Sequence, residues 1–165
     1  MNERPILEDV IMQEISGKNA AIHAYDGIVW KIRSGYLALV FGGWAILLKG
    51  LADGTLDKSN IVVVVVSMFL VSLGMSFGGC FVDCNYVRRK FRVILALNDL
   101  IGSIIENRDN LNEMSQSLLK VAGHDPAMPY KCDGYQEAAS AGKAVYFVPA
   151  VFLAFAVFSI AMFLK

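Results

Sequence analysis

The sequence has few of the residues that build catalytic and metal sites. It contains two histidines, His23 and His124, separated by two long apolar stretches. Neither lies at a spacing from acidic, serine or cysteine side chains that is typical of a catalytic triad. A Walker loop, a dinucleotide-binding fingerprint and an HExxH motif are also missing. We therefore expect no catalytic residue, no metal ligand and no cofactor, and we do not expect an enzyme.

The cysteines and the first residues of the chain give no sign of secretion. Cys80, Cys84 and Cys132 are odd in number and form no disulfide framework. Cys80 and Cys84 share a helix face, as metal ligands or a palmitoylation site would, but no second ligand pair accompanies them. A packing role is the simpler interpretation. Because the first 30 residues lack an apolar core and a small-residue cleavage site, we expect no cleaved signal peptide.

Charged residues are missing from long parts of the chain. The sequence is 56% hydrophobic and 18% charged, which is too apolar for an ordinary soluble domain. Residues 59–82 and 144–164 contain no charged residue, and residues 35–51 contain only Lys49. About 20 apolar residues, each rising about 1.5 Å, cross the hydrocarbon core of a membrane. The sequence thus predicts three transmembrane helices, at 35–51, 59–82 and 144–165. Their lack of charge disfavours a pump or a secondary transporter.

Aromatic and basic residues lie beside the first two spans. Aromatic rings prefer the headgroup region, and loop cations next to a span face the cytoplasm. Both groups therefore place the N-terminus in the cytoplasm, and three spans then put the C-terminus outside. We expect membrane lipid, and not nucleic acid, as the partner of the basic residues, in a bacterial inner membrane. The residues are Trp30, Lys31 and Arg33 before the first span and Arg88, Arg89, Lys90 and Arg92 after the second.

Two segments outside the spans are predicted to form long cytoplasmic helices, so the expected fold is all-α. Residues 1–34 are amphipathic, and residues 83–122 carry a heptad seam, followed by a connector at 123–143. Asn107 in the seam resembles the buried Asn that fixes register in coiled coils. The partner of the seam is the N-terminal helix, a second copy of the chain, or another protein. The seam consists of Leu97, Leu100, Ile104, Asn107, Leu111, Met114 and Leu118.

Small residues form two neighbouring stripes on the second span. Gly74 and Gly78 lie four apart, and so do Ser72 and Ser76. Small side chains let helix backbones approach closely in lipid, where hydrophobicity does not drive helices together. The stripes therefore predict close helix packing, either within the hairpin of the first two spans or between subunits.

Residues 24–44 have the sequence AYDGIVWKIRSGYLALVFGGW, which leads from a cytoplasmic helix into a two-span hairpin. A long cytoplasmic helix follows. In this order of elements, over about residues 5–121, the chain resembles the SLATT group of small prokaryotic membrane proteins. Members of that group are assigned as pore-forming effectors in conflict and antiphage systems. The resemblance therefore implies an effector of antiviral defence, to which the third span is an addition.

Size and packing favour assembly. The chain is too small to enclose a conduit alone, its small residues favour helix contact, and its seam needs a partner. The leading hypothesis is a homo-oligomeric membrane effector or pore, gated through its cytoplasmic helices. Uncharged spans would gate at a hydrophobic constriction. The alternative is a non-conducting membrane anchor or regulatory subunit whose cytoplasmic helices hold a soluble partner.

Overall fold

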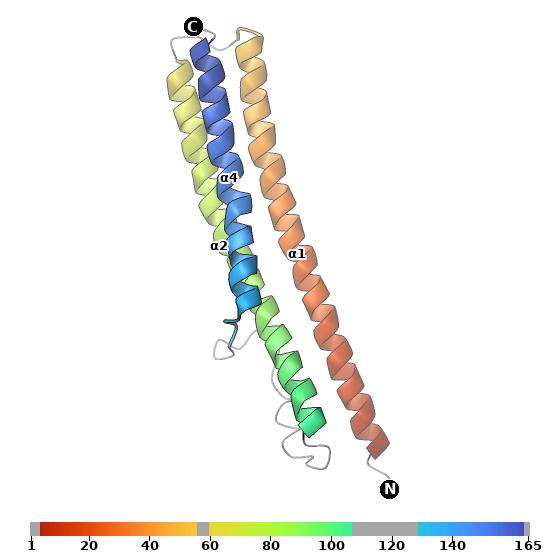
Figure 1. Cartoon of the computed structure of the whole chain (residues 1–165). Coiled ribbons are helices and arrows are strands. Elements are labelled where there is room, and N and C mark those ends of the chain that lie inside the picture. Colours follow the sequence, from red (N-terminus) through yellow and green to blue (C-terminus); the bar gives the residue numbers. More distant parts are fainter. Residues whose placement is uncertain (1–3, 56–59, 107–128, 164–165) are drawn as a thin grey trace. The chain divides into compact units, whose positions relative to one another are not determined.

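Three long helices make up the part of the chain that the structure describes. The computed structural model describes residues 4–55, 60–106 and 129–163. In it, α1 runs over Arg4–Ala52, α2 over Ile61–Glu106 and α4 over Asp133–Phe163 (Figure 1). Each of the three is long and apolar enough to cross a membrane. The prediction of an all-helical fold is confirmed for the described residues, and its three long helices have the length and apolar composition that a membrane span requires.

The helices do not stop where the side chains change character. The sequence analysis placed boundaries after residue 34 and after residue 82, but α1 and α2 continue through both positions. Backbone hydrogen bonds within a helix do not depend on whether the side chains are polar or apolar. A single helix can therefore carry a polar segment and an apolar segment in sequence.

The last helix begins earlier than expected. The backbone amides of Tyr135 and Gln136 donate to the carbonyl oxygen of Cys132, at 3.1 and 3.2 Å. Asp133 lies in the first turn, where a negative charge suits the positive end of the helix dipole. Residues 133–143, which the sequence analysis assigned to the connector, are therefore helical.

The described residues divide into two compact units, and all three helices contribute to each. The polar unit contains residues 4–29, 85–106 and 129–137, and the apolar unit contains residues 30–55, 60–84 and 138–163. Each unit has its own buried residues.

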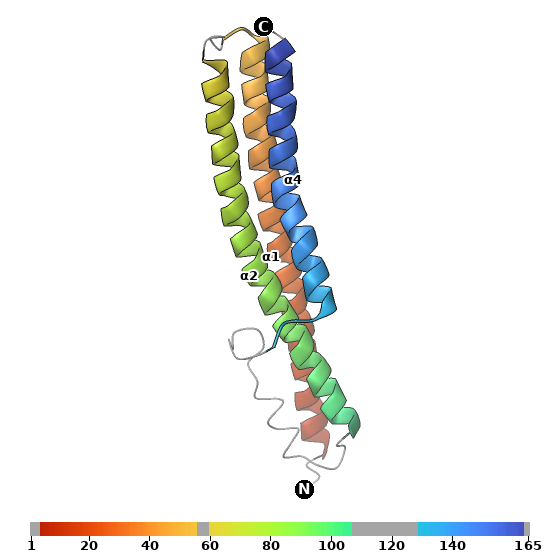
Figure 2. The same cartoon turned by 60° about the vertical axis from the view of Figure 1, so that its left-hand side comes forward.

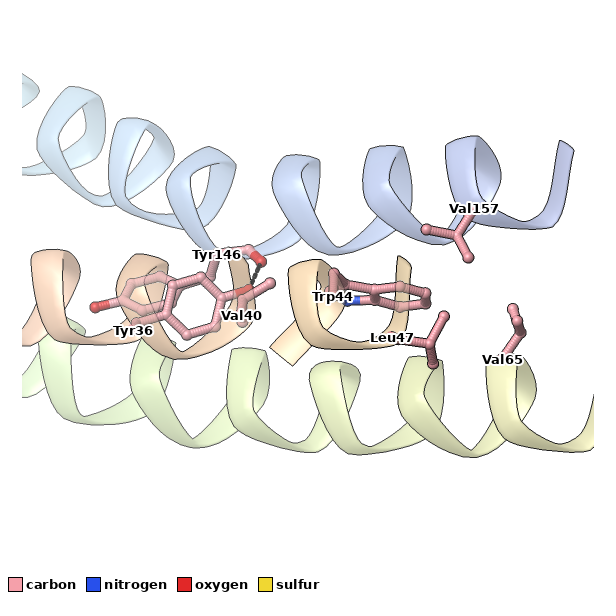
Figure 3. Packing of buried hydrophobic residues seen from close by; sticks show 7 residues of the cluster. All are labelled: Tyr36, Val40, Trp44, Leu47, Val65, Tyr146 and Val157. Atoms are coloured by element: carbon pink, nitrogen blue, oxygen red, sulfur yellow. Dashed lines mark hydrogen bonds between the residues drawn. The ribbon is translucent and has the colours of Figure 1, made fainter. Parts of the chain in front are cut away.

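In the apolar unit, parts of α1, α2 and α4 lie side by side (Figures 1 and 2). The outward faces are also apolar: Ile46, Phe81 and Phe155 are each more than two-thirds exposed. Large exposed apolar surface of this kind is typical of helices that contact lipid. Seven buried side chains form the core between the helices (Figure 3). They are Tyr36, Val40, Trp44, Leu47, Val65, Tyr146 and Val157.

In the polar unit, the first part of α1 contacts the second part of α2. Lys90 Nζ lies 2.6 Å from Asp26 Oδ1, and the rings of Tyr25 and Tyr86 are 6.3 Å apart. The described members of the seam are Leu97 and Leu100, which are buried, and Ile104, which is partly buried. Asn107, Leu111, Met114 and Leu118 lie outside the described residues.

Candidate functional site

A buried ion pair joins α1 to α2 in the apolar unit. Arg33 Nη2 donates to Asp83 Oδ2 at 2.9 Å, and Arg33 Nε lies 3.2 and 3.3 Å from the two carboxylate oxygens. Asp83 is only 1% exposed. Removing a carboxylate from water is costly unless a cation and hydrogen bonds compensate, and the paired guanidinium supplies both. The pair therefore fixes the register of α1 against α2.

The third helix packs directly on this ion pair. A Cβ atom added to Gly142 of α4 would lie 2.8 Å from Asp83 Oδ2 and 3.0 Å from Arg33 Nη2. A larger residue at position 142 would therefore have to displace one of the two charged groups. All three helices thus meet at the Arg33–Asp83 pair.

Arg33 keeps its positive charge in this pair, because the guanidinium group of arginine stays protonated in proteins.

A second meeting point lies deeper in the apolar unit, around the carbonyl oxygen of Tyr146. Tyr36 donates its hydroxyl to that oxygen, and Ser76 Oγ lies 3.0 Å from it. The two hydroxyl oxygens are 2.7 Å apart. Pro149 follows three residues later in α4 and locally disturbs the helix ladder, because it lacks an N–H and crowds the preceding turn. Hydroxyls from α1 and α2 thus supply hydrogen bonds to α4 next to its proline.

A third polar contact joins α1 to α2 further along. Trp44 Nε1 donates to Ser72 Oγ at 3.0 Å, and Ser72 Oγ donates to the Met68 carbonyl at 2.8 Å. Both Trp44 and Ser72 are buried. Ser72 and Ser76, predicted as packing residues, are therefore held inside the apolar unit by hydrogen bonds as well as by their small size.

The ring of Tyr146 lies close to the backbone of α2 at Gly79. A Cβ atom added to Gly79 would approach Tyr146 Cε1 to 2.7 Å. Figure 3 shows the rings of Tyr36 and Tyr146 side by side, with their hydroxyl groups at opposite ends. The Tyr146 hydroxyl is buried and has no hydrogen-bond partner among the described residues. Within the apolar unit, Gly79 and Gly142 thus let α4 approach its neighbours closely.

The predicted glycine stripe of α2 lies on an exposed face of the helix. Gly74 and Gly78 are exposed, and a Cβ atom added to either would meet nothing within 4 Å. Neither glycine therefore takes part in packing among the three helices of the described chain. Of the two stripes on α2, the serine stripe is used inside the apolar unit and the glycine stripe is open.

The residues predicted to contact lipid headgroups fall into separate groups. Trp30 and Lys31 are exposed, whereas Arg33 belongs to the buried ion pair. Lys90 pairs with Asp26, and the three arginines of the basic cluster stack on tyrosine rings. The clustered arginines are Arg88, Arg89 and Arg92.

The sequence did not predict the contacts by which Asp83, Tyr36 and Tyr146 join the helices. Asp83 was interpreted as the residue that bounds the second span, Tyr36 as an aromatic ring of the headgroup region, and Tyr146 as one residue of the third span. Two signals were available. Arg33 and Asp83 carry opposite charges at matching ends of two antiparallel spans, and hydroxyl groups recur inside segments that are otherwise apolar. Such groups in lipid need partners, and neighbouring helices supply them.

The described part of the chain thus contains three helices that are long and apolar enough to span a membrane. In the apolar unit, a buried ion pair and two polar contacts join these helices. Comparisons with protein-family models, with curated proteins and with solved structures gave no match to this chain.

Proposed function

We propose that the protein is a homo-oligomeric effector of a prokaryotic inner membrane that opens a pore between its subunits. In this proposal, two copies meet through the Gly74/Gly78 face of α2. The polar unit lies in the cytoplasm and transmits a trigger to the spans. The observation that carries the proposal is the open space at both glycines.

The filled interior of the apolar unit supports a pore between copies. Trp44, Tyr146 and Val157 are fully buried between the three helices. Large side chains leave little room for water along the axis of one chain. A path for ions would therefore form where several copies meet, and its uncharged wall would gate by excluding water.

The glycine stripe supports contact between copies. Two glycines four residues apart allow a second helix backbone to approach closely, and this contact is a main source of helix association in lipid. Ser72 and Ser76 already have partners within the chain, whereas Gly74 and Gly78 have none among the described residues. A second copy would fill this face better than lipid chains do.

The basic cluster supports the orientation. Because Arg33 is neutralised by Asp83, the bias toward the cytoplasm comes mainly from Arg88, Arg89 and Arg92. A cysteine introduced at position 53, in the turn after α1, should react with an impermeant reagent added to intact cells. Protection of that position would reverse the proposed orientation.

The resemblance to the SLATT group supports a role in antiviral defence. The resemblance lies in the order of elements, with a polar helical segment before and after a two-span hairpin. In such a role, the pore would stay closed until infection supplies a trigger, and opening would dissipate the membrane potential of the infected cell.

The test compares membrane potential in cells that express wild type, Gly78→Leu and Gly42→Leu. Gly42 on α1 is also exposed with nothing within 4 Å, so it is a matched control. Leucine is favourable in lipid, so all three proteins should insert. We expect wild type and Gly42→Leu to depolarise cells when the trigger or the neighbouring gene product is supplied, and Gly78→Leu to leave the potential intact.

Two results would contradict this proposal. If triggered wild type leaves the potential intact, the protein is better described as a non-conducting anchor that holds a soluble partner. If Gly78→Leu depolarises cells as wild type does, the subunit contact lies elsewhere. Purification of each variant in detergent, with its mass measured by light scattering, separates a loss of assembly from a loss of conduction.

A further inference from the structure

Two arginines of the polar unit share one aromatic ring. The guanidinium carbons of Arg88 and Arg92 lie 5.7 and 5.5 Å from the centre of the Tyr130 ring. The arginines are four residues apart on α2, so their side chains are neighbours on one face of the helix. Attraction to the ring holds both cations in place, although like charges at this spacing repel each other.

A second tyrosine positions the first of these arginines. Arg88 Nε donates to the Tyr135 hydroxyl at 3.2 Å. The Tyr135 ring packs edge-on against Tyr130, at 5.0 Å, and against Phe91, at 5.9 Å. Tyr135 lies in the first turn of α4, and Tyr130 shortly precedes that helix. The start of α4 thus forms an aromatic support for the basic cluster of α2.

The aromatic support leaves one hydrogen-bond donor of Arg92 without a partner among the described residues. Stacking occupies the face of a guanidinium group, whereas its N–H donors point outward in the plane of the group. Arg92 Nε is buried and has no hydrogen-bond partner among the described residues. Within that part of the chain, no carboxylate forms a salt bridge with Arg92 either. A buried charged donor without an acceptor is unfavourable. Arg92 as a whole is only partly buried, so an anion from outside the chain can reach the remaining N–H donors of its guanidinium group and offset this cost.

We propose that Arg88 and Arg92, supported by Tyr130 and Tyr135, bind a phosphate group. Planar guanidinium groups match phosphate oxygens in a bidentate geometry, and a dianionic or monoanionic phosphate relieves the repulsion between the two arginines. An anionic phospholipid headgroup and free phosphate share this chemistry. The cluster follows the second apolar stretch, which ends at Val82, by only a few residues, where basic side chains commonly contact anionic lipid.

The experiment uses the full chain in neutral detergent micelles. Native mass spectrometry measures binding of short-chain phosphatidylglycerol, of phosphatidylcholine with the same chains, and of inorganic phosphate. We expect one phosphatidylglycerol to bind about tenfold more tightly than phosphatidylcholine, because the quaternary ammonium group of choline offsets the negative charge of its phosphate and weakens the attraction to the two arginines. Tight binding of inorganic phosphate without preference for the lipid would support the site and identify free phosphate as its ligand.

Variants distinguish a binding site with a specific guanidinium geometry from attraction to positive charge alone. Arg92→Lys keeps the charge but loses the planar fork, and we expect it to weaken phosphatidylglycerol binding about tenfold, as Arg92→Gln does. Arg89 stacks on a different ring, that of Tyr86, so Arg89→Lys is the matched control and should bind as wild type. Circular dichroism and gel filtration check that each variant remains folded.

Three outcomes would overturn the proposal. The first is equal binding by Arg92→Lys and wild type, which would mean that charge alone attracts the ligand. The second is an equal loss in Arg89→Gln and Arg92→Gln, which would mean that the two arginines are interchangeable. The third is no preference for phosphatidylglycerol over phosphatidylcholine together with no binding of inorganic phosphate.

Discussion

Two ion pairs join α1 to α2, one in each unit, and their surroundings differ. In the apolar unit, the Asp83 carboxylate that pairs with Arg33 is 1% exposed. In the polar unit, the Asp26 side chain that pairs with Lys90 is 51% exposed. Water screens the exposed Lys90–Asp26 pair more strongly than the Arg33–Asp83 pair. Breaking the exposed pair should therefore cost less of the free energy of unfolding than breaking the buried one.

The difference extends to what specifies packing in each unit. In the polar unit, charged residues occur along the same helices as apolar residues such as Leu97 and Leu100, which are buried. The hydrophobic pattern therefore determines which faces of these helices pack together. In the apolar unit, every face is apolar, and hydrophobicity cannot distinguish one from another. There, the ion pair and the hydroxyl contacts of Tyr36 and Ser72 determine which faces meet.

The largest effect is expected from breaking the buried ion pair. Asp83→Ala leaves the Arg33 guanidinium without its partner in the apolar unit, and we expect a loss of about 3–5 kcal/mol in the free energy of unfolding. Replacing both residues, as in Arg33→Met with Asp83→Leu, should recover most of that loss. Denaturant unfolding in micelles measures both variants. Equal stability of wild type and Asp83→Ala would show that the pair does not hold the helices together.

A smaller effect is expected from filling the close approach at Gly79. Gly79→Leu forces a side chain into the space of the Tyr146 ring, and we expect a loss of about 1–3 kcal/mol from overpacking. Gly78→Leu, one residue away, points into open space and should leave the unfolding free energy of the single chain unchanged. Thermal unfolding of both variants under conditions that keep the protein monomeric makes the comparison. Equal destabilisation of the two would contradict the assigned helix faces.

The sequence predicts the three apolar helices because length and lack of charge are sufficient evidence for them. It does not predict which glycines are close to another helix. Gly74, Gly78 and Gly79 are all small residues in one segment without charge, where no charged face orients the helix. Only the position of Tyr146, more than sixty residues later in the chain, selects Gly79.

Helix ends were harder to predict than helices. Asp133 and Gly134 follow Pro129 and were interpreted as part of a turn, yet Asp133 also suits the first turn of a helix. The ion pair likewise depends on the register of α1 against α2, which no local pattern contains. Long-range pairing of this kind requires the folded arrangement.

A further prediction concerns the hydroxyl contact among the three helices. Tyr36→Phe keeps the ring in the core but removes the hydroxyl that contacts Ser76 and the Tyr146 carbonyl, and we expect a loss of about 1 kcal/mol. Tyr25→Phe in the polar unit is the control, since Tyr25 contacts Tyr86 through its ring. A Tyr36→Phe protein as stable as wild type would show that the serine hydroxyl alone satisfies the carbonyl.

The smallest effect is expected from the exposed pair. Asp26→Asn should lower the free energy of unfolding by about 0.2–1 kcal/mol, and added salt should reduce the difference further. Unfolding measured at low and high salt tests this. A loss as large as that of Asp83→Ala would remove the contrast between the two units.

The most direct test of the proposed assembly is cross-linking at the open glycine stripe. In a chain with Cys80, Cys84 and Cys132 replaced by alanine, a single cysteine is introduced by Gly78→Cys or, as the control, by Gly42→Cys. After mild oxidation of membranes, the account predicts a cross-linked dimer for Gly78→Cys and a monomer for Gly42→Cys. A monomer for Gly78→Cys, or equal cross-linking at both positions, would contradict a subunit contact through the Gly74/Gly78 face.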